Sequence, residues 1–292
     1  MVYDVFGREA TKYLPYTRNA TNGAFVPVST AITEQNTFYN SGITGTGEGL
    51  FAISKSNFEA SPRGLVTQEY GPGKDWQSTN NKPVKYNYFT NVHGTVTGQE
   101  QIIAWTINGS GMPVRKSTVT GFVLTGGYYA TGQLSIKSVI DENGNESREY
   151  IDKSGKTILK KVYETGDMLA LNTPANWIQT YYVYDAIGNL RFVFQPSLSH
   201  TLSLNATNIP SAADINAAGF EYRYDSRNRM IAKKVPGAEW VEMVYDPFDR
   251  VVLVRDGNDQ SQSVTTAIQL AAYDGKNYRI QGTGSVTLKP GY

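Results

Sequence analysis

The sequence contains no cysteine and only two histidines, His93 and His200. Without cysteine the chain can form neither disulfides nor thiolate metal sites. Two histidines are too few for a metal centre built from several imidazoles, and we expect both to be surface loop residues. The fold must be held by its hydrophobic core and backbone hydrogen bonds alone, and we expect no cofactor.

Charged residues are scarce, at 18% of the chain, and they balance to a net charge of +1. Nucleic-acid-binding domains usually carry a basic patch or stripe, so the composition argues against a nucleic-acid partner. No apolar run approaches the roughly 18 residues that a membrane-spanning helix needs. Residues 1–7 also lack the basic start and apolar stretch of a signal peptide. We expect the chain to be a fragment of a longer protein whose export signal lies elsewhere.

Aromatic residues and glycine are abundant: 12% of the 292 residues are aromatic, with 20 Tyr, and 28 are Gly. Tyr, Thr and Val suit a pleated, half-buried surface, whereas Gly and Asn suit the turns between strands. The aromatic content is too high for a disordered chain. The composition therefore predicts an all-β protein of one large or two ordinary domains.

A five-residue pattern recurs along the chain: Asp, two variable residues, a residue tolerant of positive φ, and a basic or amide residue. Asp at the first place suits a type I turn, because its carboxylate can accept hydrogen bonds from backbone N–H groups further along. A type I turn followed by a left-handed residue is a common β-hairpin connection. Six clear copies and a looser seventh are Asp4–Arg8, Asp141–Asn145, Asp152–Lys156, Asp185–Asn189, Asp225–Arg229, Asp246–Arg250 and Asp274–Tyr278.

The fourth and preceding places of the pattern are also restricted. Only Gly, Asn and Asp occupy the fourth place, and these are the residues that best accept the left-handed conformation. The fourth residues of the six clear copies are Gly7, Gly144, Gly155, Gly188, Asn228 and Asp249. Tyr precedes the Asp in five of the seven copies, as Tyr3, Tyr184, Tyr224, Tyr245 and Tyr273. Apolar and alternating segments flank the turns, as in 177–184, 190–194 and 220–224, and predict strand, turn, strand.

The segment Tyr184-Asp185-Ala186-Ile187-Gly188-Asn189-Leu190 resembles the YD repeat of RHS proteins, of insecticidal toxin-complex subunits and of teneurin-type adhesion proteins. Tyr3–Arg8 matches through its basic residue, and the opening 3–16 is similar to RHS proteins of Bacteroidetes-type bacteria. The resemblance implies a ribbon of consecutive antiparallel β-hairpins that curves or spirals into part of a hollow shell. In toxin members such a shell encloses a toxic C-terminal segment. The terminal motif and self-cleavage site of those members are not found here.

The resemblance divides the chain into two regions of one continuous ribbon. Residues 139–292 are expected to form YD-repeat hairpins, and residues 1–138 divergent β-hairpins with long Gly- and Asn-rich loops. Asn108-Gly109 predicts a tight hairpin turn. Strands are predicted at 82–89, 101–107, 121–124 and 133–137.

One insertion interrupts the hairpin series between Asp185 and Asp225. Ser211 is a plausible helix N-cap and Gly219 a plausible helix end, so we expect one short inserted helix near 211–218. A ribbon with open strand edges is also expected to self-associate.

Catalytic patterns are missing. No Gly-x-Ser-x-Gly elbow surrounds any serine. The acidic groups at 141–146 and at 246–249 fall in expected surface turns, where the environment that separates two carboxylate pKa values is absent. The Gly-rich segment 42–49 matches no phosphate-binding motif, and 141–145 lacks the spacing of a calcium loop, although adventitious calcium there is left open. We expect no enzyme activity.

Three functions are compatible with these features. The first is a structural segment of a bacterial extracellular or cell-surface shell, whose partners are the remainder of its own chain and an enclosed toxin segment. The second is a carbohydrate-binding or adhesion module, in which tryptophans stack on a glycan, although core packing is the other interpretation of these rings. The third and least favoured is a glycoside-active enzyme. The tryptophans are Trp76, Trp105, Trp177 and Trp240.

Overall fold

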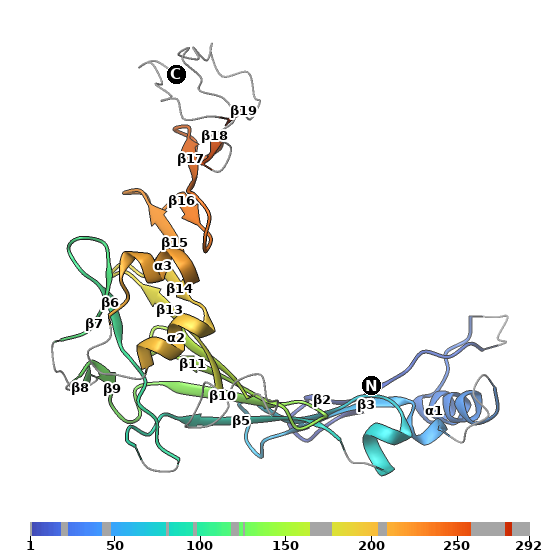
Figure 1. Ribbon diagram of the computed structural model, residues 1–292. Helices are drawn as coiled ribbons and strands as arrows, with labels where there is room; N and C mark the ends of the chain where they lie inside the picture. Colours follow the sequence, from blue (N-terminus) through green and yellow to red (C-terminus); the bar gives the residue numbers. More distant parts are fainter. Residues whose placement is uncertain are drawn as a thin grey trace. The chain divides into compact units, whose positions relative to one another are not determined.

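In this computed structural model the chain is mostly β, arranged as antiparallel hairpins with a few short helices (Figure 1). This confirms the predicted all-β hairpin fold. The residues described are 2–18, 23–42, 48–79, 82–95, 98–117, 123–124, 126–163, 177–203, 209–257 and 278–281. Contacts group the chain into two compact units. Unit 1 is Met1–Phe89, Ile136–Glu149 and Val162–Thr165, and unit 2 is Thr90–Ser135, Tyr150–Lys161 and Gly166–Tyr292.

The strands of unit 1 follow one another in the sheet in chain order, apart from the step from β5 to β10. Each of the pairs from β1 to β5 is antiparallel. These strands are β1 (Val2–Tyr3), β2 (Glu9–Tyr13), β3 (Ile53–Phe58), β4 (Val66–Tyr70), β5 (Val84–Thr90), β10 (Ser135–Ile140) and β11 (Glu146–Ile151).

Short helical elements lie between the strands of unit 1. Between β2 and β3 are α1 (Val28–Thr37), the π-helical turn η1 (Phe38–Gly42) and the 3₁₀ turn η2 (Gly49–Phe51). The π-helical turn η3 (Asp75–Thr79) follows β4. The buried Gln35 fastens α1 to the strands, because its side-chain amide donates to the Ala52 carbonyl at 2.5 Å and to the Leu14 carbonyl at 3.3 Å. A side chain at Gly49 would collide with the carbonyl oxygen of Asn36, 2.3 Å from its Cβ, so only glycine fits here.

Unit 2 continues the hairpin series. Its main strands also pair in chain order; the five pairs from β13 to β18 are antiparallel, and β18 pairs with β19 in parallel. They are β12 (Thr157–Tyr163), β13 (Trp177–Tyr184), β14 (Leu190–Phe194), β15 (Gly219–Tyr224), β16 (Met230–Lys234), β17 (Val241–Tyr245), β18 (Val251–Asp256) and β19 (Tyr278–Gln281). Two small hairpins accompany them, β6 (Trp105–Ile107) with β7 (Pro113–Arg115) and β8 (Val123–Leu124) with β9 (Tyr128–Tyr129).

The core of unit 2 lies against one face of the β13–β14 pair. Tyr181 is opposite Phe194 in the register, and both side chains are buried. The Trp105 ring packs edge-on against both, with centroids 5.2 Å from Phe194 and 6.3 Å from Tyr181. Burying each such side chain contributes roughly 1.5–3 kcal/mol, so this aromatic cluster fixes the β6–β7 hairpin against the strands.

The helix predicted near 211–218 is confirmed as α3 (Ala212–Ala218), and two further helices, α1 and α2 (Pro196–Ser203), were not predicted. α3 begins as expected, with a reciprocal capping box between Ser211 and Asp214. Gly219 does not end it in a left-handed conformation: it is extended, with φ −120°, and begins β15. Glycine is required there because a Cβ would lie 2.9 Å from the Ile215 carbonyl oxygen.

The two missed helices differ in how readable their sequences are. α2 starts at Pro196, a favoured first helical residue, and buries Leu198 and Leu202 four residues apart. These signals were available. α1 has no side-chain cap at its start, so tertiary packing sets its position more than local sequence does. His200 lies in α2 and is half-buried, which corrects its placement in a surface loop.

Several predicted strands are shifted or shortened. β5 and β10 begin two residues after the predicted starts, and the strand predicted at 101–107 begins only at Trp105. Ile102 and Ile103 are buried without being part of a strand. For the prediction at 121–124, only 123–124 fall within the described residues, where they form β8. His93 forms an isolated bridge with Glu100 and is half-buried, and so is not a surface loop residue. Within the described ranges, no helix has the length and apolar character needed to cross a membrane.

The connection at Asn108-Gly109 is not a two-residue turn. Asn108 N–H donates to the Met112 carbonyl, and the Gly111 N–H donates to the Asn108 carbonyl, each at 2.9 Å. The Asn108 side-chain oxygen accepts the N–H groups of Ser110 and Met112, and Gly111 has φ +80°. The turn is thus a five-residue turn of the Asp type, with Asn in the first place.

We predict that Gly144→Ala lowers the free energy of unfolding by about 1–2 kcal/mol, because Gly144 has φ +89° and an L side chain is strained there. The space around the added Cβ is empty, so strain is the only cost. Urea unfolding measures the effect. Asn143→Ala, at the neighbouring exposed position of the same turn, is the control and should change stability by less than about 0.5 kcal/mol. Equal effects at the two positions would contradict the explanation.

Candidate functional site: the linked Asp turns

All six clear copies of the repeated pattern adopt one backbone geometry. In each, the N–H of the first residue donates to the carbonyl of the fifth, and the N–H of the fourth donates to the carbonyl of the first, at distances of 2.9–3.1 Å. The fourth residue is left-handed in every copy, with φ between +61° at Asn228 and +104° at Gly188. The seventh copy, at Asp274–Tyr278, lies outside the described residues except for Tyr278.

The first Asp caps its own turn. Its Oδ1 accepts the backbone N–H groups of the third and fifth residues, at 2.8–3.1 Å, in all six copies. The hairpin register slips by one residue at the position before the Asp, as seen at Tyr3, Tyr184, Tyr224 and Tyr245. This slip is the bulge that a left-handed residue introduces at the end of a hairpin.

The fifth residue binds the other carboxylate oxygen of the same Asp. Arg229 Nε donates to Asp225 Oδ2 at 2.7 Å, and Asn145 Nδ2 donates to Asp141 Oδ2 at 2.8 Å. Arg8 and Arg250 make the same bond to Asp4 and Asp246, and Asn189 makes it to Asp185. Each of these aspartates therefore has both oxygens occupied within its own turn.

These bonds change the acidity of the capping carboxyls. Hydrogen bonds from the Arg229 backbone lower the pKa of Asp225, and the Asn145 side chain lowers the pKa of Asp141. Partial removal from water acts to raise the pKa of Asp4 and of Asp246, but the bonds from the fifth residue outweigh it, and both pKa values lie below their usual range. The ionised carboxylate is thus the form that the turns require.

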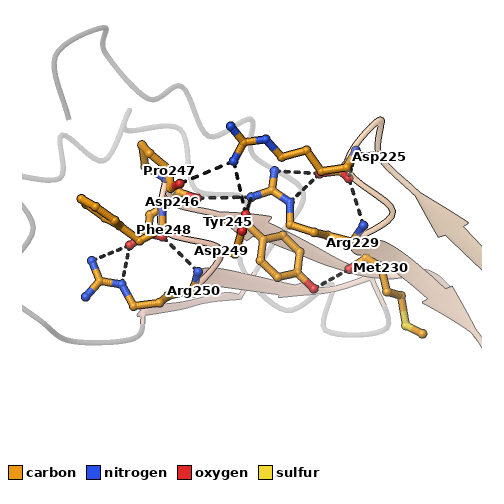
Figure 2. A network of polar contacts seen from close by, with 10 residues as sticks. Asp225, Arg229, Met230, Tyr245, Asp246, Pro247, Phe248, Asp249 and Arg250 are labelled. Carbon is orange, nitrogen blue, oxygen red and sulfur yellow. Dashed lines mark hydrogen bonds and ion pairs between the residues drawn. The ribbon is translucent and has the colours of Figure 1, made fainter.

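Neighbouring turns of unit 2 are joined by side chains. Figure 2 shows the join between the turns at Asp225 and Asp246. Arg229 Nη1 donates to the Asp249 carboxylate at 2.7 Å and to the Asp246 carbonyl at 3.2 Å. The exposed Arg227 adds a 3.3 Å contact to Asp249. Arg229 therefore serves two turns at once, capping one and binding the next.

At two of the joins, the Tyr before the Asp adds contacts from the other side. Tyr245 donates its hydroxyl to the Met230 carbonyl at 2.8 Å, and the Arg229 guanidinium lies 4.8 Å from the centre of the Tyr245 ring. Tyr184 repeats the arrangement two joins earlier, since its hydroxyl donates to the Thr157 carbonyl at 3.0 Å and Lys156 Nζ lies 5.6 Å from its ring. A cation over an aromatic face is stabilising, so the Tyr and the fifth residue of the preceding turn form one unit.

The same join occurs in unit 1 with different residue types. The Arg8 guanidinium lies 4.6 Å from the Phe58 ring, and its Nη1 donates to the Glu59 and Ser61 carbonyls at 3.2 and 2.7 Å. Phe58-Glu59 stands where Tyr-Asp stands elsewhere, and Gly64 has φ +76°. This turn was not predicted from the sequence, and the turn at Asn108 was predicted but not recognised as a copy of the pattern, because neither begins with Asp. An acidic or amide residue three or five positions before a glycine was the available signal.

The four tryptophans lie in separate environments. Trp76 belongs to η3 in unit 1 and is 42% exposed, whereas Trp105 in unit 2 is only 8% exposed. Trp240 is covered by the Arg223 guanidinium, 3.8 Å from a ring centre, and Trp177 begins β13 half-buried. The structure does not present them as one aromatic surface.

The repeated aspartates spend their oxygens on backbone and side-chain N–H groups, and the cations lie on rings. The described part of the chain contains no group of three or more His, Cys, Asp or Glu that could hold a metal ion.

Residues 1–90 match the family model of a domain of unknown function, DUF6443. No curated protein sequence matches the chain. Similar solved structures include a TccC3 mutant of the Photorhabdus luminescens Tc holotoxin pore, at 16% identity and a TM-score of 0.33, covering 70% of this chain and 9% of that one. Others are a TcdB2–TccC3–Cdc42 structure (12%, 0.29, covering 72% and 11%) and TcdB2–TccC3 without its hypervariable C-terminal region (12%, 0.28, covering 70% and 10%). The chain spans about a tenth of their length.

We predict that Arg229→Met lowers the urea midpoint of unfolding clearly more than Arg227→Met. Arg229 bonds to Asp225, Asp246 and Asp249 and is 23% exposed, whereas Arg227 is 60% exposed and makes only peripheral contacts. Exposed ion pairs contribute little to stability. The two variants remove the same charge two residues apart, so net charge is controlled. A larger effect of Arg227→Met would show that the join does not depend on the fifth residue.

We also predict that the protein loses stability as pH falls below the usual Asp value near 3.8. A carboxyl whose pKa is lowered by folding contributes stability that is complete above its unfolded pKa and lost as pH falls through its folded pKa. Urea unfolding from about pH 6 to pH 2 measures the slope. Asp225→Asn keeps an acceptor oxygen but cannot titrate, so its stability should fall less steeply in acid than that of the natural protein. An unchanged slope would contradict the assignment.

Proposed function

We propose that this chain is a non-catalytic structural segment of an RHS/YD-repeat shell that encloses or presents a polypeptide. The observation that supports it most directly is the join between successive turns. At Arg229 and at Arg8, the fifth residue binds the Asp of its own turn and contacts the aromatic residue of the next turn. Both residues of the recurring Tyr-Asp pattern then have a physical role: the Asp caps its own turn, and the Tyr contacts the fifth residue of the preceding turn. The proposal includes the absence of enzyme activity.

The joins explain how such a wall could be extended. Along the main series of strands each hairpin pairs with the hairpins beside it, so stability accumulates by adjacent units, as in other repeat proteins. The β6–β7 hairpin adds a local core where it packs on the β13–β14 pair. Further hairpins can be added without redesigning those already present. The proposed partners are the remainder of the same polypeptide and a toxin-type segment within it, and the proposed location is the outside or the surface of a bacterium.

The experiment is protease protection in the natural full-length protein that contains this chain. If the shell encloses another segment of the protein, that segment should resist protease in the native protein. The same protease concentration should digest the segment after mild denaturation has released it. Arg229→Met and Arg8→Met should open the wall and increase cleavage of that segment. Arg227→Met is the matched control and should leave protection unchanged. The proposal would be overturned if this chain stays intact in the native protein while every other segment is cleaved as fast before denaturation as after it.

A further inference from the structure

A pocket of about 280 Å³ lies within unit 2, between two successive Asp turns. The turns at Asp152 and Asp185 supply one side of it. The β6–β7 hairpin and β9 supply the other. The residues that the argument uses are Trp105, Tyr129, Asp152, Lys156, Tyr182 and Tyr184.

The turn at Asp152 departs from the others in a way that leaves polar groups available to the pocket. In the other five copies, the side chain of the fifth residue binds the second oxygen of the capping Asp. No such bond joins Lys156 to Asp152 within the described part of the chain. Both side chains line the pocket instead, so a carboxylate oxygen and an ammonium face it without neutralising each other.

The neighbouring turn is shaped to admit the Lys156 side chain. A Cβ at Gly188 would lie 2.5 Å from Lys156 Nζ, so any larger residue there would displace the ammonium. Gly188 also has φ +104°, which other residues rarely adopt. The ammonium is held above the Tyr184 ring at the pocket, 5.6 Å from its centre.

One further polar group belongs to the pocket wall. Burial, with a smaller contribution from the Asp152 carboxylate, raises the pKa of Tyr129 to about 12, so its phenol keeps its proton. The residues that line the pocket therefore carry a neutral hydroxyl, an ammonium and a carboxylate among aromatic rings.

The balance of charges selects the ligand class. Two lysines and two aspartates line the pocket, so neither a strong anion nor a strong cation is favoured. Hydroxyl groups both donate and accept, and so can satisfy the ammonium, the phenol and the carboxylate together. The rings of Tyr182 and Tyr184 suit the apolar face of a small ring. We propose that this inter-turn pocket binds a neutral polyhydroxylated ring of monosaccharide size.

The inference goes beyond the structural role proposed above and does not depend on it, because a segment of a shell wall can also carry a ligand site. Loss of protease protection and loss of ligand binding are separate measurements. Trp105 is one residue of the pocket lining and is only 8% exposed, so the pocket differs from the exposed tryptophan platform considered from the sequence.

The test uses the purified chain with glucose, galactose, mannose and N-acetylglucosamine as separate probes. Tryptophan fluorescence and saturation-transfer NMR should show saturable binding of at least one of them in the millimolar range. Lys156→Met should weaken that binding roughly tenfold or more, the usual cost of losing a hydrogen bond to a charged group. Lys153→Met is the control, because Lys153 is exposed in the same turn and outside the pocket.

Further arms keep the result decisive. Tyr129→Phe removes one hydroxyl and should also weaken binding, so the test remains usable if Lys156→Met lowers stability. Glucuronate and glucosamine carry the same ring with one negative or one positive charge and should bind more weakly than the neutral probes. Three outcomes would each overturn the proposal. They are no saturable binding of any neutral probe, binding by Lys156→Met and Tyr129→Phe that is as tight as that of the natural protein, and tighter binding of a charged probe.

Discussion

The left-handed residue at the fourth place of each turn is the constraint on which the hairpins depend. It reverses the chain in five residues, and it leaves backbone N–H groups pointing inward where no strand can receive them. The Asp at the first place meets this need, because one carboxylate oxygen accepts two of those N–H groups in every described copy. The second oxygen then fixes the fifth side chain, and that side chain is what reaches the neighbouring turn. Local turn chemistry thus determines a contact between hairpins that are distant in sequence.

This dependence explains why the sequence can vary while the arrangement persists. The fifth place holds Arg8, Asn145, Lys156, Asn189, Arg229 or Arg250, which share donor groups rather than shape. Arginine does most, because its guanidinium can bind its own Asp, a carbonyl of the next turn and an aromatic face together. Lysine has one donor group and at Asp152 gives up the bond to its own Asp. Lysine at the fifth place therefore removes one side-chain bond from this turn, and both Asp152 and Lys156 line a pocket.

The sequence was informative wherever the structure is local. The six turns, their left-handed residues and the capping box of α3 follow from residues a few positions apart, and all could be stated in advance. The joins between turns could not, because no single-sequence pattern says that Tyr184 donates to the Thr157 carbonyl 27 residues earlier. α1 was missed for a related reason: it lacks a cap, and its place is set by Gln35 bonding to two carbonyls of distant segments. The strand predicted at 101–107 is shortened to Trp105–Ile107, because Ile102 and Ile103 are buried in a segment that is not part of a strand.

The type of residue at the fourth place depends on the contact that the turn makes with the preceding turn. Gly188 leaves room for the Lys156 side chain that reaches over it. Asn228 and Asp249 adopt positive φ at a conformational cost that glycine would avoid. Each of them accepts a hydrogen bond from the fifth residue of the preceding turn: Asn189 Nδ2 donates to Asn228 Oδ1 at 3.1 Å, and Arg229 donates to Asp249. The loss of glycine from the repeat is therefore not decay of the motif, because the side chain gained at the strained position binds the next hairpin.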